Sequence, residues 1–379
     1  MKIGNQAINN EAFVCVQCHY CRICPAYSVL KWESVSPRGR MYLLRGIIKG
    51  EIEPDSRVVE DFYRCTTCGA CEAVCQTSIP LIEVWERARS EFVNAGIAPL
   101  PVHRKLKEVA EKNGNPYGEK REERAKWAQK YQFKNDAGIL FFAGCTASYR
   151  MMELAKSTVE ILMKAGVDFT YAGEDEHCCG SPFLRTGQRD IAYWFFRKNL
   201  EEWKKRGVKT IVTTCSGCYR TIGKDYPEIA EELGYEWNLK VIHTVHLIWE
   251  LIESGKLGFE RSYEAVTFHD PCHLGRHMKV YQLPRRILEK MGYQIVEMEH
   301  TMENSLCCGA GGGVKSQFKD LALQIGKKRI NEAIKTGSGM VVSACPFCKL
   351  HLIHAAEKKI EVRDIVELVN ERAKPLNTD

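Results

Sequence analysis

The chain has 379 residues, of which 45% are hydrophobic and 27% are charged, and its formal net charge is +6. This composition is typical of a globular protein of two or three domains and excludes disordered and fibrous classes. The excess positive charge falls mainly between His103 and Lys134. No aromatic platform or reading motif accompanies it, so no nucleic-acid partner is expected.

The eighteen cysteines are the exception in this composition. Most of them stand in C-x-x-C or C-C pairs, which are too close in sequence to bridge distant segments. The chain is also much longer than the small secreted domains that depend on disulfides. The pattern therefore favours metal ligands.

The first residues, Met1 to Phe13, contain no apolar run typical of a secretory signal. No apolar stretch elsewhere approaches the ~18–20 residues needed to span a bilayer. We expect a cytoplasmic protein, peripheral to the membrane only through a partner.

Residues 1–100 are expected to form a helical module, because apolar residues recur at helical spacing in Arg40–Lys49 and Leu81–Phe92. A charged segment follows, which we interpret as a linker over residues 101–135. It contains the turn-forming sequence Asn113–Gly118, which marks a domain boundary.

From residue 136 onward, short β-rich runs alternate with amphipathic segments, which predicts βαβ units and a mainly parallel sheet. The pattern occurs twice, at residues 136–258 and 259–379. Residues 137–145, 178–180 and 208–218 align with 264–272, 307–309 and 339–348 at offsets of about 127 to 130 positions, which indicates an internal duplication. The expected fold class is α+β overall: a helical ferredoxin-like module followed by two duplicated α/β domains.

Eight cysteines of the first module form two runs. The second run, from Cys65 to Cys75, has the spacing C-x2-C-x2-C-x3-C of bacterial ferredoxins, in which the fourth cysteine serves the other [4Fe-4S] cluster. The expected cluster sets are Cys65, Cys68, Cys71 with Cys24, and Cys15, Cys18, Cys21 with Cys75.

Two features of these runs leave alternatives open. Only two residues precede Cys24, where the usual run has three, so the spacing alone does not fix Cys24 as a ligand. Pairs of C-x2-C also form tetrahedral zinc sites, so a zinc-stapled scaffold is an alternative. Evenly spaced triplets with a distant fourth cysteine favour cubane clusters.

The ten later cysteines form two sets with one spacing formula: a single cysteine, a C-C pair and a C-x2-C pair. Ligands of parallel α/β sheets collect at the carboxyl ends of strands, so each set is expected to converge on one site. Lys224 and Asp225, on the helix after the first set, are expected at the surface. The sets are Cys145, Cys178, Cys179, Cys215, Cys218 and Cys272, Cys307, Cys308, Cys345, Cys348.

Glycines and histidines flank these sets. Gly180 and the run Gly309–Gly313 are expected to allow close backbone approach and to direct N–H groups towards sulfur. The run lacks the G-x-G-x-x-G spacing of a dinucleotide loop, so no NAD or flavin is expected in this chain. His177, His269 and His273 lie one to three residues from cysteines, and both proton donation and structural packing are open to them.

The five-cysteine formula resembles the CCG cysteine-rich domain of heterodisulfide reductases and related anaerobic iron-sulfur oxidoreductases. The order of a ferredoxin-like module and two CCG domains is similar to the fused catalytic subunit of heterodisulfide reductase, over nearly the whole chain. The segment Ser36–Arg40 also resembles one found in the iron-sulfur subunits of flavin-dependent 2-hydroxyacid dehydrogenases. The resemblance implies that each five-cysteine set binds a noncubane [4Fe-4S] cluster and that these ten cysteines form the catalytic centre.

The implied function is an oxidoreductase subunit in which two cubane clusters pass electrons to two noncubane clusters that reduce a disulfide, such as coenzyme M-coenzyme B heterodisulfide. The alternative is a non-catalytic relay in a flavoprotein dehydrogenase, an electron-bifurcating complex or a benzoyl-CoA-reductase-type complex. Electrons are expected from a partner: a flavoprotein, another redox subunit or a membrane cytochrome. The sequence does not determine the donor, the disulfide, the direction of flow or the oligomer.

Overall fold

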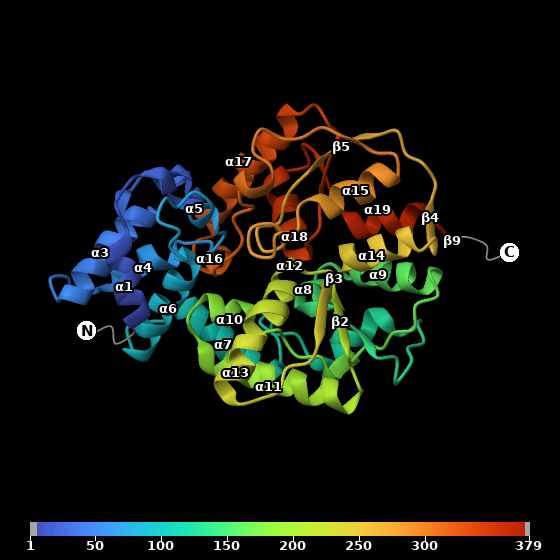
Figure 1. The fold of residues 1–379 in the computed structure, drawn as a ribbon, viewed down its shortest axis with the longest axis horizontal. Coiled ribbons are helices and arrows are strands. Elements are labelled where there is room, and N and C mark those ends of the chain that lie inside the picture. The colour runs from blue at the N-terminus through green and yellow to red at the C-terminus, as the bar shows by residue number, and fades with distance from the viewer. Residues whose placement is uncertain (1–5, 376–379) are drawn as a thin grey trace.

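The computed structural model describes residues 6–375 and is drawn in Figure 1. Residues 1–5, which belong to the segment searched for a secretory signal, and residues 376–379 lie outside the described part. The N-terminal part is helical, and 3₁₀ turns connect its helices. These elements are α1 Gln6–Val14, η1 Tyr20–Ile23, α2 Pro25–Leu30, η2 Glu33–Val35, α3 Pro37–Lys49, α4 Ser56–Tyr63, α5 Ala70–Ala73, α6 Leu81–Asn94, α7 Pro101–Asn113 and η3 Arg121–Ala128.

Helix α3 shows why this module forms helices where the sequence predicts them. Ser36 caps its first turn by accepting a hydrogen bond from Gly39 N at 2.9 Å, and Pro37 occupies the first helical position. The helix ends at Gly50, whose φ of 75° closes it in the left-handed conformation. The apolar faces of α3 and α6 lie in one core with both ferredoxin-like cysteine runs at its edge.

The rest of the chain consists of two α/β halves. The first contains β1 Ile139–Phe141, α8 Gly144–Tyr149, α9 Met152–Lys164, η4 Gly173–Asp175, α10 Ser181–Arg185, α11 Arg189–Lys205, β2 Thr210–Thr213, α12 Ser216–Arg220, the π-helical turn η5 Thr221–Asp225, α13 Tyr226–Leu233, β3 Lys240–His243 and α14 Thr244–Glu253. The second contains β4 Leu257–Phe259, β5 Ala265–Phe268, α15 Gln282–Lys290, β6 Gln294–Ile295, η6 Met302–Asn304, α16 Val314–Gln317, α17 Lys319–Lys335, β7 Met340–Ser343, α18 Pro346–Ala356, β8 Glu361–Asp364, α19 Ile365–Arg372 and β9 Ala373–Pro375.

The two halves have corresponding parallel sheets, which agrees with the predicted duplication and confirms the fold class. The first sheet has the order β1-β2-β3, and the second has the order β6-β5-β7-β8. A single parallel bridge between Leu140 and Thr170 stands where β6 pairs with β5 in the second half. The short strands β4 and β9 pair antiparallel outside these sheets.

The three parts of the chain share one compact arrangement (Figure 1). Helix α9 of the first half packs on α19 of the second, and two hydrophobic clusters contain side chains of both halves. The helical module lies at one end of this pair of halves. Among residues 6–375, no helix is long and apolar enough to cross a membrane.

The segment expected to be a charged linker is folded. Helix α7 and turn η3 contribute the buried side chains of His103, Ala110, Arg124 and Trp127, while most of their charged residues face solvent. The linker interpretation accounts for the exposed charges. It does not include the buried positions, which depend on distant partners.

His103 joins the helical module to the second α/β half. Its Nε2 donates to the carbonyl oxygen of Gly313 at 2.9 Å, and its ring stacks on Tyr63 with centroids 5.3 Å apart. Burial lowers the pKa of His103 to about 4. The folded protein therefore holds this ring neutral at pH values where an unfolded histidine is protonated.

We expect stability to fall as the pH drops below about 6.5, the pKa of an unfolded histidine, towards about 4 in the folded state. Over this window the unfolded chain binds a proton that the folded chain does not. Midpoints of anaerobic urea unfolding, measured from pH 7.5 down to pH 5, check this. His103→Gln, which keeps a donor without the titration, should show a shallower decline, and an equally steep decline contradicts the assignment.

Candidate metal centres

The first five-cysteine set lies beyond the carboxyl ends of β1 and β2. Cys145 lies in α8, Cys178 and Cys179 precede α10, and Cys215 and Cys218 stand at the start of α12. All five are buried. Their sulfur atoms form a line of hydrogen-bond contacts in the order 145, 178, 179, 218 and 215.

The second set repeats this arrangement beyond β5 and β7. Cys272 follows β5, Cys307 and Cys308 lie in the loop before α16, and Cys345 and Cys348 stand at the start of α18. Their contacts run in the order 272, 307, 308, 348 and 345. The structure thus brings each predicted set together at the predicted edge of its sheet.

The two sets also meet each other and the helical module. The thiols of Cys215 and Cys345 are in hydrogen-bond contact, and nearby Ser216 Oγ donates to Ala344 O at 2.7 Å. At its other end, the second set touches the ferredoxin-like run, because Cys307 contacts Cys68. Sulfur atoms therefore follow one another from the helical module through the second set to the first.

The glycine run makes the contact with the helical module possible. A Cβ atom added at Gly312 would lie 2.2 Å from Cys65 O, and one at Gly311 would lie 2.5 Å from Thr66 O. Behind the run, Gly309 N donates to Cys307 Sγ at 3.3 Å. Gly180 N donates to Cys178 Sγ at 3.4 Å in the first half. The predicted close approach and N–H donation to sulfur are confirmed.

The eight cysteines of the helical module separate into two groups. Cys24 lies near Cys65, Cys68 and Cys71, and these four are buried. The other four line one small cavity and are more exposed: Cys15, Cys18, Cys21 and Cys75. The shortened spacing before Cys24 thus does not keep this residue away from the second run.

Arg40 is a buried cation that faces the inner group of four cysteines. Its Nε donates to Asp61 O at 2.8 Å, whereas Nη1 and Nη2 have no hydrogen-bond partner within the described chain. Burial raises the pKa of Cys24, and Arg40 opposes that rise. A guanidinium with free donors beside four buried thiols suits an anionic cluster.

A second buried arginine faces the first five-cysteine set. Arg124 Nη2 donates to Cys145 Sγ at 3.2 Å, and Nη1 pairs with Glu176. Glu176 in turn accepts from Ala143 N and Gly144 N, both at 2.9 Å. Burial raises the pKa of Glu176 to about 7, although Arg124 opposes this. The hydrogen bond from Cys178 lowers the pKa of Cys145, and Arg124 lowers it further.

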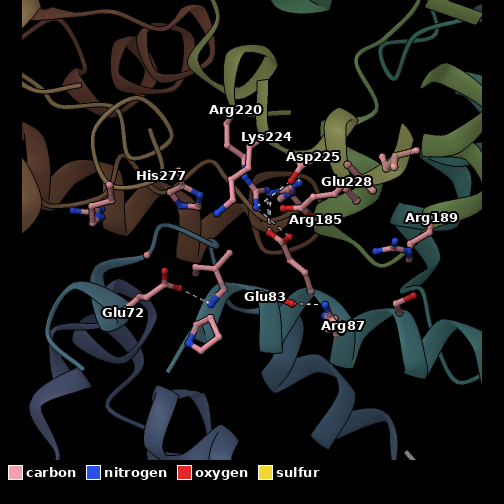
Figure 2. A pocket seen from close by; sticks show the side chains of 18 of the residues that line it. Glu72, Glu83, Arg87, Arg185, Arg189, Arg220, Lys224, Asp225, Glu228 and His277 are labelled. Atoms are coloured by element: carbon pink, nitrogen blue, oxygen red, sulfur yellow. Dashed lines mark hydrogen bonds and ion pairs between the residues drawn. The ribbon is translucent and has the colours of Figure 1, made fainter. Parts of the chain in front are cut away.

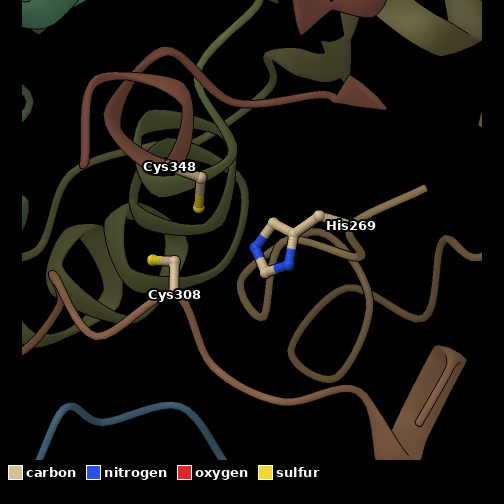
Figure 3. A group of neighbouring side chains, drawn as sticks. All are labelled: His269, Cys308 and Cys348. Carbon is tan, nitrogen blue, oxygen red and sulfur yellow. The ribbon is translucent and has the colours of Figure 1, made fainter. Parts of the chain in front are cut away.

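The three flanking histidines have different surroundings. His177 donates from Nδ1 to Asp175 O at 2.9 Å and packs edge-on against Trp194, so it has a structural place. His273 packs against His277 with ring centroids 4.6 Å apart. His269 lies closest to sulfur: a ring nitrogen of His269 and the Sγ atoms of two cysteines lie within 4.8 Å of one another (Figure 3), and these are Cys308 and Cys348.

A cavity of about 830 Å³ opens where the three parts of the chain meet (Figure 2). Its wall includes α6 of the helical module, the segment from α10 to α13 of the first half, and the loop after Cys272. Both charges occur on the wall, with Arg185, Arg220, Arg276, Lys224 and Lys279 among its cations.

The prediction for Asp225 is wrong, because this side chain is buried, while Lys224 is exposed as expected. The π-helical turn η5 directs Asp225 towards Arg185 and Arg220, and both arginines also pair with Glu86 of the helical module. Glu86 and Arg185 are site residues that the sequence reasoning missed. No local pattern marks them, since they meet only across the domain boundary.

The sulfur positions fit iron-sulfur clusters, because the thiols converge in groups with N–H donors and buried cations beside them. Two family models match this chain. The 4Fe-4S dicluster domain matches residues 11–79, and the CCG cysteine-rich domain matches residues 139–223 and again 266–353.

The chain is 36% identical over 388 residues to an iron-sulfur relative from Methanosarcina barkeri, which is one subunit of the dihydromethanophenazine:CoB--CoM heterodisulfide reductase, covering 95% of this chain and 94% of that relative. It is 30% identical to the EtfAB:quinone oxidoreductase of Syntrophomonas wolfei, covering 82% of this chain and 46% of that protein. A crystal structure of a hypothetical protein from Helicobacter pylori superposes with a TM-score of 0.63 at 10% identity, covering 96% and 72% of the chains, which shows a shared fold.

A dicluster helical module joined to two CCG domains defines an iron-sulfur oxidoreductase subunit. The protein is an electron-transfer subunit of an anaerobic redox complex, and the predicted function is confirmed at this level. The chain belongs to the heterodisulfide reductase family of CCG-domain iron-sulfur proteins.

Proposed function

We propose that this chain reduces an organic disulfide with electrons received from a redox partner. Two cubane [4Fe-4S] clusters would be held by the two four-cysteine groups, and two noncubane [4Fe-4S] clusters by the two five-cysteine sets. When bound, these clusters supply one-electron steps. The net reaction takes two electrons and two protons, breaks one S–S bond and forms two thiols.

The observation that carries this proposal is the continuous line of sulfur contacts. The junction of Cys68 with Cys307 connects the helical module to the second set, and the junction of Cys215 with Cys345 connects the two sets. Two ligand sets in direct contact offer one place where both sulfurs of a disulfide can be held. A simple relay does not require such a pair.

The outer cysteine group supports electron entry from a partner. Cys18 is exposed, and the three other cysteines of its group are partly exposed. Large apolar side chains stand exposed beside this group at Phe13, Val16 and Tyr20. An exposed apolar surface around a redox site suits a partner subunit, and a flavoprotein or a cytochrome has the required chemistry.

The cavity supports a substrate with anionic ends. Lys224 and Lys279 line it, and no carboxylate within the described chain lies at ion-pair distance from either ammonium group. Arg276, which donates from Nε to Cys68 O at 2.7 Å, keeps one Nη unpaired on the same wall. The Methanosarcina barkeri relative is named for the CoB--CoM heterodisulfide, and a disulfide of that kind is the substrate class we propose.

Two carboxyls on the cavity wall are suited to supply protons. Burial raises the pKa of Glu86 to about 7 and that of Asp225 to about 6. Both carboxyls are held between Arg185 and Arg220, so their positions are fixed. Groups that change protonation near neutral pH suit proton transfer to thiolates.

A relay role is the second candidate. The similarity to a quinone oxidoreductase extends over 82% of this chain, so the same arrangement of domains occurs in a protein named for a different acceptor. In that case the five-cysteine sets would pass electrons on and the cavity would bind no disulfide.

Anaerobic purification of the full chain, followed by iron analysis and a viologen-driven disulfide assay, distinguishes these roles. The proposal expects about sixteen iron atoms per chain and turnover of an anionic disulfide. Full iron loading without turnover of any disulfide overturns the proposed activity and leaves the relay. Zinc in place of iron would overturn both.

Changing the two unpaired lysines tests the substrate class. The double variant Lys224→Ala, Lys279→Ala should raise KM for a dianionic disulfide by about tenfold, at ~1 kcal/mol for each exposed charge contact. KM for a neutral disulfide and the iron content should stay unchanged. Lys126→Ala, at an exposed lysine outside the cavity, is the matched control. An equal rise in KM for both disulfides contradicts an anionic substrate.

A further inference from the structure

His269 has a fixed tautomer, because Arg329 determines which ring nitrogen can carry the proton. His269 directly follows β5 and is 1% exposed. Arg329 Nε, on α17, donates to His269 Nδ1 at 3.0 Å. A guanidinium has only donors, so Nδ1 must accept, and the single proton of the neutral ring lies on Nε2.

Arg329 itself is held in place. Its side chain is fully buried and donates to His300 O at 2.9 Å, to Phe268 O at 3.3 Å and to Glu332 at 2.6 Å. A protonated, cationic His269 would set an N–H at Nδ1 against the N–H of this arginine. The geometry therefore selects the neutral ring with its proton on Nε2.

Nε2 of His269 points towards sulfur. Within the described chain it has no nitrogen or oxygen partner, and the ring is in hydrogen-bond contact with the thiol of Cys308 (Figure 3). One histidine with two cysteines, here Cys308 and Cys348, is a common metal-ligand group. A nitrogen that carries a proton has no free lone pair for iron, so His269 is a hydrogen-bond donor and not a ligand.

The first half has no equivalent group. The residue aligned with His269 through the offset of Cys145 and Cys272 is Phe142, which is buried and has no donor. There the charged donor is Arg124, and it reaches Cys145 at the opposite end of the line of sulfurs. The two five-cysteine sets are therefore inequivalent at the C-C pair and the C-x2-C pair.

We propose that His269 donates an N–H hydrogen bond to Cys308 sulfur and thereby raises the reduction potential of the cluster held by the second five-cysteine set. This inference rests on the proposed function only in that iron is bound at Cys308, and it requires no disulfide turnover. Hydrogen bonds to cluster sulfurs favour the reduced, more negative state. The site beside Cys68 then accepts an electron from the helical module more readily than it would without His269.

The direct test compares His269→Phe, which copies Phe142, with His269→Gln, which keeps an N–H donor. The full chain is purified anaerobically with matched iron content and titrated under EPR detection. His269→Phe should shift one cluster signal to a more negative potential and leave the others in place, and His269→Gln should shift it less. His354→Phe, at an exposed histidine on α18, should shift none.

Unchanged potentials in His269→Phe, or an equal shift in both variants, overturn the proposal. If His269→Phe does not retain its iron, pulsed EPR on the unaltered protein decides. A weak ¹⁵N coupling together with an exchangeable proton supports donation, and a coupling of the size seen for iron-bound imidazole overturns it. Neither measurement uses the disulfide assay, so its failure is distinguishable from failure of the proposed activity.

Discussion

Replacing Arg89 with leucine is expected to lower the free energy of unfolding by about 3–5 kcal/mol, at ~1–3 kcal/mol for each buried carbonyl left without its donor. Arg89 lies on α6 and is fully buried. Its guanidinium donates to carbonyls of all three parts of the chain, and these are Phe62 O, Cys65 O, Arg185 O and Gly312 O.

The measurement is the midpoint of anaerobic urea unfolding, followed by tryptophan fluorescence and by cluster absorbance. Arg89→Lys should lose less, because the ammonium keeps the charge but lacks the planar fork that reaches several carbonyls. Arg87→Leu, two positions away on the same helix, removes an arginine that is paired at the surface with Glu83 and should change stability by less than ~1 kcal/mol. If Arg89→Leu behaves like this control, Arg89 does not hold the three parts together.

Replacing Arg124 with leucine should remove the cluster proposed for the first five-cysteine set, or weaken its binding by ~10–100-fold. The change takes away the donor to Cys145 Sγ and leaves Glu176 buried without its cation. Iron should fall towards twelve per chain, about one [4Fe-4S] cluster fewer than the proposed sixteen. Iron analysis and EPR of the remaining clusters measure this loss.

Arg121→Leu is the matched control for Arg124, because Arg121 lies on the same turn but is partly exposed and donates to Glu174 O at 2.8 Å. Adding Glu176→Gln to Arg124→Leu should recover part of the iron, since it removes the uncompensated charge while an amide oxygen can still accept from Gly144 N. Full iron loading in Arg124→Leu would show that the guanidinium is dispensable for the first set.

Local patterns in the sequence were sufficient for the cysteine sets and for the duplication. Strand and helix periodicity placed β5 and β7 next to Cys272 and Cys345, because the period of a buried strand depends on neighbouring residues only. The ferredoxin spacing separated inner from outer cysteines, and the structure groups Cys24 with Cys65 as that spacing predicts.

The charged groups of the site could not be predicted in this way. Asp225 follows Cys218 on a segment with the pattern of an ordinary amphipathic helix, and only the π-helical turn and Glu86 of another domain explain its burial. Arg124 looks like one of many charges in a linker. Its burial depends on Cys145 and Glu176, which lie 21 and 52 positions further along the chain.

The sequence by itself determined the class of protein, because ligand spacing is a local property of the chain and cluster chemistry requires that spacing. Only the tertiary structure decided that the cysteine sets form one line and which cation faces which sulfur. The contact of Cys307 with Thr66 joins residues 241 positions apart, and the bond from Arg89 to Gly312 joins residues 223 apart. Such pairs are determined by how the three parts pack, and no periodicity within any one part records that packing.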